Sequence, residues 1–135
     1  MNEELSKSLA KKISDSEFTA SDLPDFFTVF CEMCNESEDI KSEMSGWSVK
    51  LQFNIADGDK LWLKAADGTL TSGKGDIEDP DTTLATSGDV AAKVFTGEKD
   101  ATSAYLDGSL KVSGKLSEAL KLRGIIGSVL EKLQG

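Results

Sequence analysis

Histidine is absent from the 135-residue sequence, and this absence narrows the chemistry that the protein can perform. Histidine is the commonest general acid or base, the usual activator of a nucleophile and a frequent metal ligand. The sequence also lacks a glycine-rich phosphate loop and the GxSxG and HExxH patterns. We therefore predict that the protein is not an enzyme, and that it has no catalytic residues, no cofactor and no metal ion.

Cysteine is scarce, and its two copies form one pair, Cys31-x-x-Cys34. Such a pair is typical of a redox couple or of half a zinc site, but no second pair is present. The cysteines share a helical spacing with Phe26, Phe27 and Phe30, which indicates one buried helix face. We predict that both thiols pack in the core, and a thiol-redox role is the alternative.

Carboxylates are abundant, and four of them crowd into residues 75–81, "GDIEDPD". Oxygen ligands of this kind suit Ca²⁺, but the ordered spacing of an EF-hand loop is absent. The pattern therefore favours a solvated loop over a metal site.

Long apolar runs are lacking too. The first residues, "MNEELSKSLAKK", are charged where a signal peptide would be apolar, and no run approaches the roughly 18 apolar residues of a membrane span. These features predict a cytoplasmic protein.

The charge is acidic and unevenly distributed. The formal net charge is −9, and residues 1–45 hold 11 acidic and 4 basic side chains, which gives −7. This balance excludes a general attraction to nucleic acid. From residue 109 onward, 5 basic and 2 acidic side chains give +3, which predicts either a transient contact with an anionic membrane or simply a solvated helix face.

Helical patterns occupy the first third of the chain. Residues 3–13 place Leu5, Leu9 and Ile13 on one side, and a second helix begins near Asp22 as its N-cap. Residues 35–45 either extend this helix or form a connector. Residues 1–45 are thus a helical N-terminal part.

At Gly46 the apolar period changes from 3.6 to 2, because every odd position from Trp47 to Ile55 is apolar and the even positions are polar. This strand is expected to have one buried face and one solvent-exposed face. Asp57-Gly58 and Asp67-Gly68 are tight-turn pairs, so that a three-stranded antiparallel meander is expected. The further elements are expected in this order: strands at 60–65, 69–77 and 82–86, helices at 87–97 and 98–108, a strand at 109–114 and a helix at 116–133.

The order of these elements predicts a single α+β domain over residues 1–135, with helices packed on one face of the sheet. Its last helix is unusually apolar, because its apolar side chains spread over roughly 220°, whereas a helix on one core needs a stripe of about 100°. Gly124 and Gly127 are expected to kink or break this helix. The surplus apolar arc requires either a guest molecule or a second subunit.

The second half of the chain resembles the sterol carrier protein type two family over roughly residues 46–126. That family shows a threonine-rich strand, a short helix ending in Thr-Gly, a small-residue helix with an aromatic, a G-x-L-K-[IV]-x-G strand and an A-x-K-L helix. The matching segments are Thr82-Thr83-Leu84, Phe95-Thr96-Gly97, residues 101–105, residues 108–114 and Ala119-Leu120-Lys121-Leu122.

The resemblance implies a five-stranded, mostly antiparallel sheet covered on one face by helices, with an apolar tunnel between them. It further implies non-catalytic binding or transfer of a fatty acid, fatty acyl-CoA, sterol or phospholipid by a monomer or homodimer. The alternative is a structural or dimerisation module that accompanies a lipid-metabolising enzyme. The predicted lipid-binding residues are Phe26, Phe30, Leu51, Phe53, Leu63, Leu84, Val94, Phe95, Tyr105, Leu120, Ile125, Ile126 and Val129.

Arg123 is the candidate for a head-group contact. It falls inside the apolar arc of the last helix, near 340° if Leu116 is at about zero. A guanidinium there either holds a lipid carboxylate or phosphate, or reaches out to solvent from the helix.

Overall fold

The computed structural model describes residues 3–56, 58 and 60–134, and its five strands form one mixed sheet in the order β3-β2-β1-β4-β5. The β1–β2, β2–β3 and β4–β5 pairs are antiparallel, whereas β1 and β4 are parallel. The predicted mostly antiparallel α+β fold is therefore confirmed. The strands are β1 (Val49–Ile55), β2 (Leu61–Ala66), β3 (Thr69–Lys74), β4 (Thr82–Thr86) and β5 (Leu110–Gly114).

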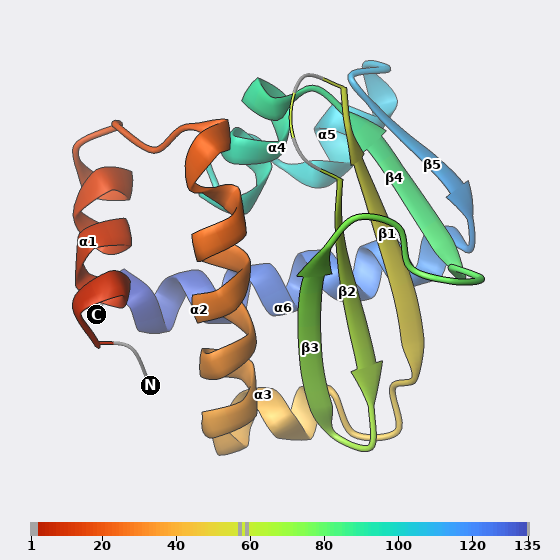
Figure 1. The fold of residues 1–135 in the computed structure, drawn as a ribbon, viewed down its shortest axis with the longest axis horizontal. Helices are drawn as coiled ribbons and strands as arrows, with labels where there is room; N and C mark the ends of the chain where they lie inside the picture. The colour runs from red at the N-terminus through yellow and green to blue at the C-terminus, as the bar shows by residue number, and fades with distance from the viewer. Residues whose placement is uncertain (1–2, 57, 59, 135) are drawn as a thin grey trace.

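Helices lie on one face of this sheet, and α6 runs behind the strands across their direction (Figure 1). The helix α2 packs against β3, while α6 contacts β4, β5 and the other long helices. The helices are α1 (Glu3–Ser14), α2 (Leu23–Glu36), α3 (Glu38–Glu43), α4 (Gly88–Phe95), α5 (Ala101–Leu106) and α6 (Leu116–Gln134), with a 3₁₀ turn at Ala20–Asp22.

Capping residues set several of these boundaries. Ser37 has an extended backbone and accepts a hydrogen bond from the Ile40 N–H, so α2 ends at Glu36 and Glu38–Glu43 form a separate short helix. Ser87 caps α4 in the same way. Asp22 does occupy the N-cap of α2, but its carboxylate binds the Thr19 N–H and Lys12 instead of α2.

The turns and the last helix test three further expectations. Asp67 and Gly68 both have positive φ, as a two-residue hairpin turn requires, whereas Asp57 of the other turn lies outside the described residues. The expected break at Gly124 and Gly127 is wrong, because one helix, α6, spans Leu116–Gln134. Side-chain packing of α6 on its neighbours outweighs the roughly 1 kcal/mol cost of each helical glycine.

The face of β1 that was expected to be exposed to solvent is covered at Gln52, whose side chain is buried. Because the sheet order places β4 beside β1, the chain leaving β3 must cross the outer face of the sheet. Gln52 holds this crossing segment: it accepts a hydrogen bond from the Ile77 N–H at 2.8 Å and donates one to the Gly75 carbonyl at 3.1 Å.

Gly114, where β5 leads into α6, allows a close backbone approach. Its φ is +95°, and a Cβ there would collide with the carbonyl of Asp81. We expect Gly114→Ala to lower the free energy of unfolding by about 3 kcal/mol, from left-handed strain plus the collision. Gly108→Ala is the matched control, since Gly108 has φ +84° with no atom near the added Cβ, and about 1 kcal/mol is expected. Equal losses in urea denaturation of the two variants would contradict the collision.

Candidate functional site

A cavity of about 280 Å³ lies between the sheet and helices α4, α5 and α6. Its lining is almost entirely apolar. The lining residues are Phe53, Leu84, Thr86, Ala91, Val94, Phe95, Ala101, Thr102, Tyr105, Leu106, Leu110, Val112, Leu116, Ala119, Leu120, Leu122, Arg123 and Ile126.

The space exists because small side chains face the sheet from the surrounding helices. Ala91 on α4, Ala101 and Thr102 on α5 and Ala119 on α6 all line the cavity. These side chains are too short to reach the strands opposite, so the layers are separated there without being filled. Protein interiors normally leave few voids larger than a water molecule.

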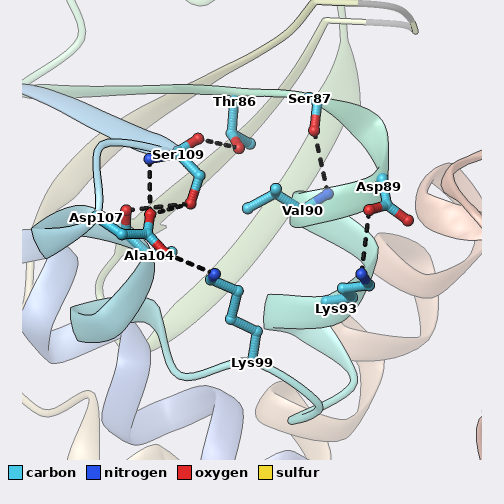
Figure 2. Close-up of polar contacts among 9 residues, drawn as sticks. All are labelled: Thr86, Ser87, Asp89, Val90, Lys93, Lys99, Ala104, Asp107 and Ser109. Carbon is cyan, nitrogen blue, oxygen red and sulfur yellow. Dashed lines mark hydrogen bonds and ion pairs between the residues drawn. The ribbon is translucent and has the colours of Figure 1, made fainter.

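Polar contacts fix α5 and β5 around the cavity (Figure 2). The Thr86 hydroxyl donates to the Ser109 carbonyl at 2.8 Å, and the Ser109 N–H donates to Asp107 at 2.9 Å. Lys99 closes the group with a 2.7 Å ion pair to Asp107. The Lys99 ammonium and then the Ser109 donors hold the pKa of Asp107 well below its ordinary value. The turn between α5 and β5 is thus tied both to β4 and to the segment that leads into α5.

The predicted lipid-binding residues fall into two groups. One group lines the cavity: Phe53, Leu84, Val94, Phe95, Tyr105, Leu120 and Ile126, together with Arg123. The other group is buried in the adjoining core and does not line it: Phe26, Phe30, Leu51, Leu63, Ile125 and Val129. Contact of this second group with a ligand stays a prediction.

Phe95 stands at the junction of cavity and core. Its ring centroid lies 4.9 Å from that of Phe27, 5.7 Å from Phe53, 5.8 Å from Phe26 and 6.1 Å from Phe30. Phe95 is only 3% exposed and also lines the cavity. Phe95, together with Phe53, therefore lies between the aromatic core under α2 and the open space under α5 and α6.

Sequence reasoning missed the small lining residues, because it selected large apolar side chains. The inward pattern of Leu110 and Val112 on the last strand was a usable signal, and so was Ala91 in the apolar stripe of α4. No signal marked Leu106, which follows Tyr105 at the end of α5 and is 78% exposed.

The surplus apolar arc of α6 is divided between two environments. Leu122, Ile125 and Val129 are buried. Leu116 and Leu120, in contrast, are 40% and 50% exposed at the rim of the cavity. The helix thus packs one arc on the protein and presents another to the cavity mouth.

Arg123 lies at the same rim with a half-exposed side chain. Its Nε donates to Asp100 Oδ1 at 2.6 Å, just before α5 begins. This hydrogen bond is the main cause that lowers the pKa of Asp100. The structure gives no second partner for the guanidinium within the described ranges, so its terminal Nη groups remain available beside the apolar lining.

The other candidate sites, the cysteine pair and the acidic loop, do not line the cavity. Cys31 and Cys34 are buried and unbridged, and burial raises the pKa of Cys31 to about 11 and that of Cys34 further. Both are thus held as thiols rather than reactive thiolates at neutral pH. In the acidic loop, Asp81 accepts from the Lys50 N–H and Asp76 pairs with Lys60. Within the part of the chain that the structure describes, no three or more Asp, Glu, Cys or His are grouped to hold a metal.

Across residues 3–56, 58 and 60–134, no helix combines the length and the apolar character needed to cross a membrane.

A mixed five-stranded sheet, helices on one face and an apolar cavity between the layers define a class of small α+β domains. The model of the SCP-2 sterol transfer family matches residues 28–127. Because the match covers well over half of the sequence, the chain belongs to the SCP-2 sterol transfer family, and the resemblance inferred from its motifs is confirmed.

Solved structures share the fold at low identity. Sterol carrier protein 2 from Yarrowia lipolytica in its apo form is 22% identical with a TM-score of 0.63, and the match covers 76% of this chain and 87% of that one. The sterol carrier protein domain 2 of Helicoverpa armigera is 19% identical with a TM-score of 0.63, covering 78% and 86%.

A larger protein contains a similar domain. The stereoselective inverting sec-alkylsulfatase Pisa1 from Pseudomonas sp. is 19% identical with a TM-score of 0.62 over 76% of this chain, which spans only 15% of the alkylsulfatase. At these identities the likeness shows the fold alone. A comparison with curated protein sequences gives no significant match.

Proposed function

We propose that this domain binds and transfers, without chemical conversion, an amphiphilic lipid with one acyl chain. The observation that carries the proposal is the apolar cavity of about 280 Å³ between the sheet and α4, α5 and α6. This volume is just below the roughly 300–1,000 Å³ of small-molecule sites, which favours one acyl chain over a sterol or a two-chain phospholipid. Membership of the SCP-2 sterol transfer family supports a lipid as the guest.

Energetic considerations support an occupant. Left empty, a cavity of this size costs at most about 7 kcal/mol, at about 24 cal/mol per Å³. A guest removes this cost and gains about 0.8 kcal/mol for each methylene that leaves water. Closed apolar cavities stay dry and accept apolar guests, and the lining here is apolar in the same way. The polar groups on the lining have no arrangement suited to catalysis, so a carrier role fits them better than an enzymatic one.

The direct test is native mass spectrometry of the freshly purified protein, followed by delipidation and titration with cis-parinaric acid, a fluorescent fatty acid. We expect a lipid mass or saturable binding at micromolar concentrations with about one site per chain. Absence of both a carried lipid and saturable binding would overturn the proposal.

Arg123 is proposed to hold the lipid carboxylate at the rim, with Asp100 fixing the orientation of the guanidinium. The 2.6 Å bond engages Nε, which leaves the terminal nitrogens for a two-point contact with an oxyanion. We expect Arg123→Met to weaken binding of a fatty acid about tenfold, the low end for a hydrogen bond to a charged group, because the site is half exposed.

The same variant is expected to bind the fatty alcohol of equal chain length as the wild type does. Lys93→Met is the matched control, since Lys93 is half exposed on α4, pairs with Asp89 and does not line the cavity. Displacement of cis-parinaric acid measures both ligands. Equal weakening of acid and alcohol would show that Arg123 acts on the cavity shape and not on the carboxylate.

A structural or dimerisation module remains the second candidate function. It is favoured by the exposed Tyr105, Leu106, Leu116 and Leu120 and by the similar domain within the much larger alkylsulfatase. Light scattering coupled to size exclusion separates the two: a delipidated dimer without fatty-acid binding favours the module. A monomeric or homodimeric state and a cytoplasmic location both stay predictions.

A further inference from the structure

The exposed large apolar side chains of the described residues gather at one place. They are Tyr105 and Leu106 on α5 and Leu116 and Leu120 on α6, and all four also line the cavity. Leu106 is 78% exposed, so it contributes little to packing of the folded chain. We call these four residues the mouth patch. Exposed apolar side chains clustered around one opening indicate a surface that meets an apolar phase.

The acidic groups near the mouth patch all have partners. Asp100 pairs with Arg123 and Asp107 with Lys99, while Glu118 accepts a hydrogen bond from Trp47 Nε1 and Asp81 accepts one from the Lys50 N–H. Lys115 and Lys121 flank Leu116 and Leu120 in sequence and are exposed, and the structure gives their ammonium groups no ion pair within the described residues.

Most of the net negative charge of the molecule lies elsewhere. The 11 acidic and 4 basic side chains of residues 1–45 belong to the part of the chain that forms α1, α2 and α3. Figure 1 places α1 and α3 at the left and bottom, far from α5 at the upper right. An anionic surface would therefore attract the end of the molecule that carries the mouth patch and repel the opposite end.

We propose that the mouth patch docks on an anionic lipid bilayer, with Lys115 and Lys121 contacting the head groups and Leu106 and Leu120 entering the interface. Charge complementarity favours this occupant over a second copy of the chain, in which the same lysines would face each other. The inference rests on the proposed function, because a lipid that enters through this mouth passes from bilayer to cavity without crossing water.

The test is flotation of the full-length protein with phosphatidylcholine vesicles that contain about one-third phosphatidylserine, at about 0.1 M salt. Lys115→Glu with Lys121→Glu is expected to lower binding at least about 30-fold, since each lysine near such a surface contributes about 1 kcal/mol. Lys41→Glu with Lys64→Glu changes the net charge by the same amount at exposed positions away from the mouth patch and should bind nearly as the wild type does.

A second variant tests the contribution of the apolar side chains of the mouth patch. Leu106→Ser is expected to weaken vesicle binding about tenfold, because an exposed leucine no longer enters the interface. The wild type should bind pure phosphatidylcholine vesicles weakly, and about 1 M salt should release it from the anionic ones.

The outcomes separate docking from cavity binding. Titration with cis-parinaric acid in solution should be unchanged in the Lys115/Lys121 variant, since neither residue lines the cavity. Fatty-acid binding without flotation of the wild type overturns docking and leaves the proposed function standing, whereas loss of both overturns both. Equal loss in the two double variants, or a stable dimer that buries Leu106, also overturns docking.

Discussion

Ala119→Trp is expected to abolish saturable fatty-acid binding without lowering the stability of the domain. Ala119 is half-buried on α6 and lines the cavity, so an indole there occupies space that the ligand needs. Filling an apolar cavity usually raises stability or leaves it unchanged. A variant that loses fatty-acid binding but is as stable as the wild type, or more stable, indicates a site that is empty in the free protein.

Ser117→Trp is the matched control for this change. Ser117 is exposed on the same helix, two residues away, and does not line the cavity. We expect the control to bind cis-parinaric acid with wild-type affinity, whereas Ala119→Trp weakens binding at least about 100-fold, because most methylene contacts are lost. Wild-type binding by Ala119→Trp would mean that the ligand lies elsewhere.

Phe95→Ala is expected to lower the free energy of unfolding by about 4 kcal/mol, as deletion of a fully buried phenyl ring typically does. Phe95 contacts the rings of Phe26, Phe27, Phe30 and Phe53, so its removal opens the aromatic core to the cavity. Total stabilities of small domains are about 5–15 kcal/mol, and the loss is therefore a large fraction.

Tyr105→Ala serves as the comparison, because Tyr105 also lines the cavity but is 41% exposed. A loss below about 1 kcal/mol is expected for it in urea denaturation. Added fatty acid should restore part of the stability of Phe95→Ala by binding only the folded state. A loss below about 1 kcal/mol for Phe95→Ala would show that the aromatic core can close over the gap.

Alternation and turn chemistry were strong enough to predict most of the fold. In β1, the odd positions from Val49 to Ile55 are buried as expected, because a strand places successive side chains on opposite faces. The Asp67-Gly68 turn needs positive φ at both residues, which few other pairs adopt readily. The Ser37 break after α2 was not predicted, because both a longer helix and a connector suit the same polar sequence.

Gln52 shows what local pattern could not predict. Its position alternates with buried residues and is polar, which indicates a solvated side chain. It is buried because the segment after β3 must cross the sheet to reach β4, and only the strand order makes that crossing necessary. The continuity of α6 through Gly124 and Gly127 has a similar origin, since neighbours on its buried arc hold the helix.

The sequence by itself determined most of the elements, the core-facing side of each and the excess of apolar surface on α6, because these depend on periodicity and on local backbone preferences. Only the tertiary structure decided which apolar residues fill space and which surround it. Phe26 and Phe30 are packed in the core, whereas Ala91, Ala101 and Ala119 line the cavity. Periodicity predicts which side of a helix or strand a side chain lies on. Whether that side chain contacts a neighbour depends on the distance between the sheet and the helices, and segments far apart in the sequence determine that distance.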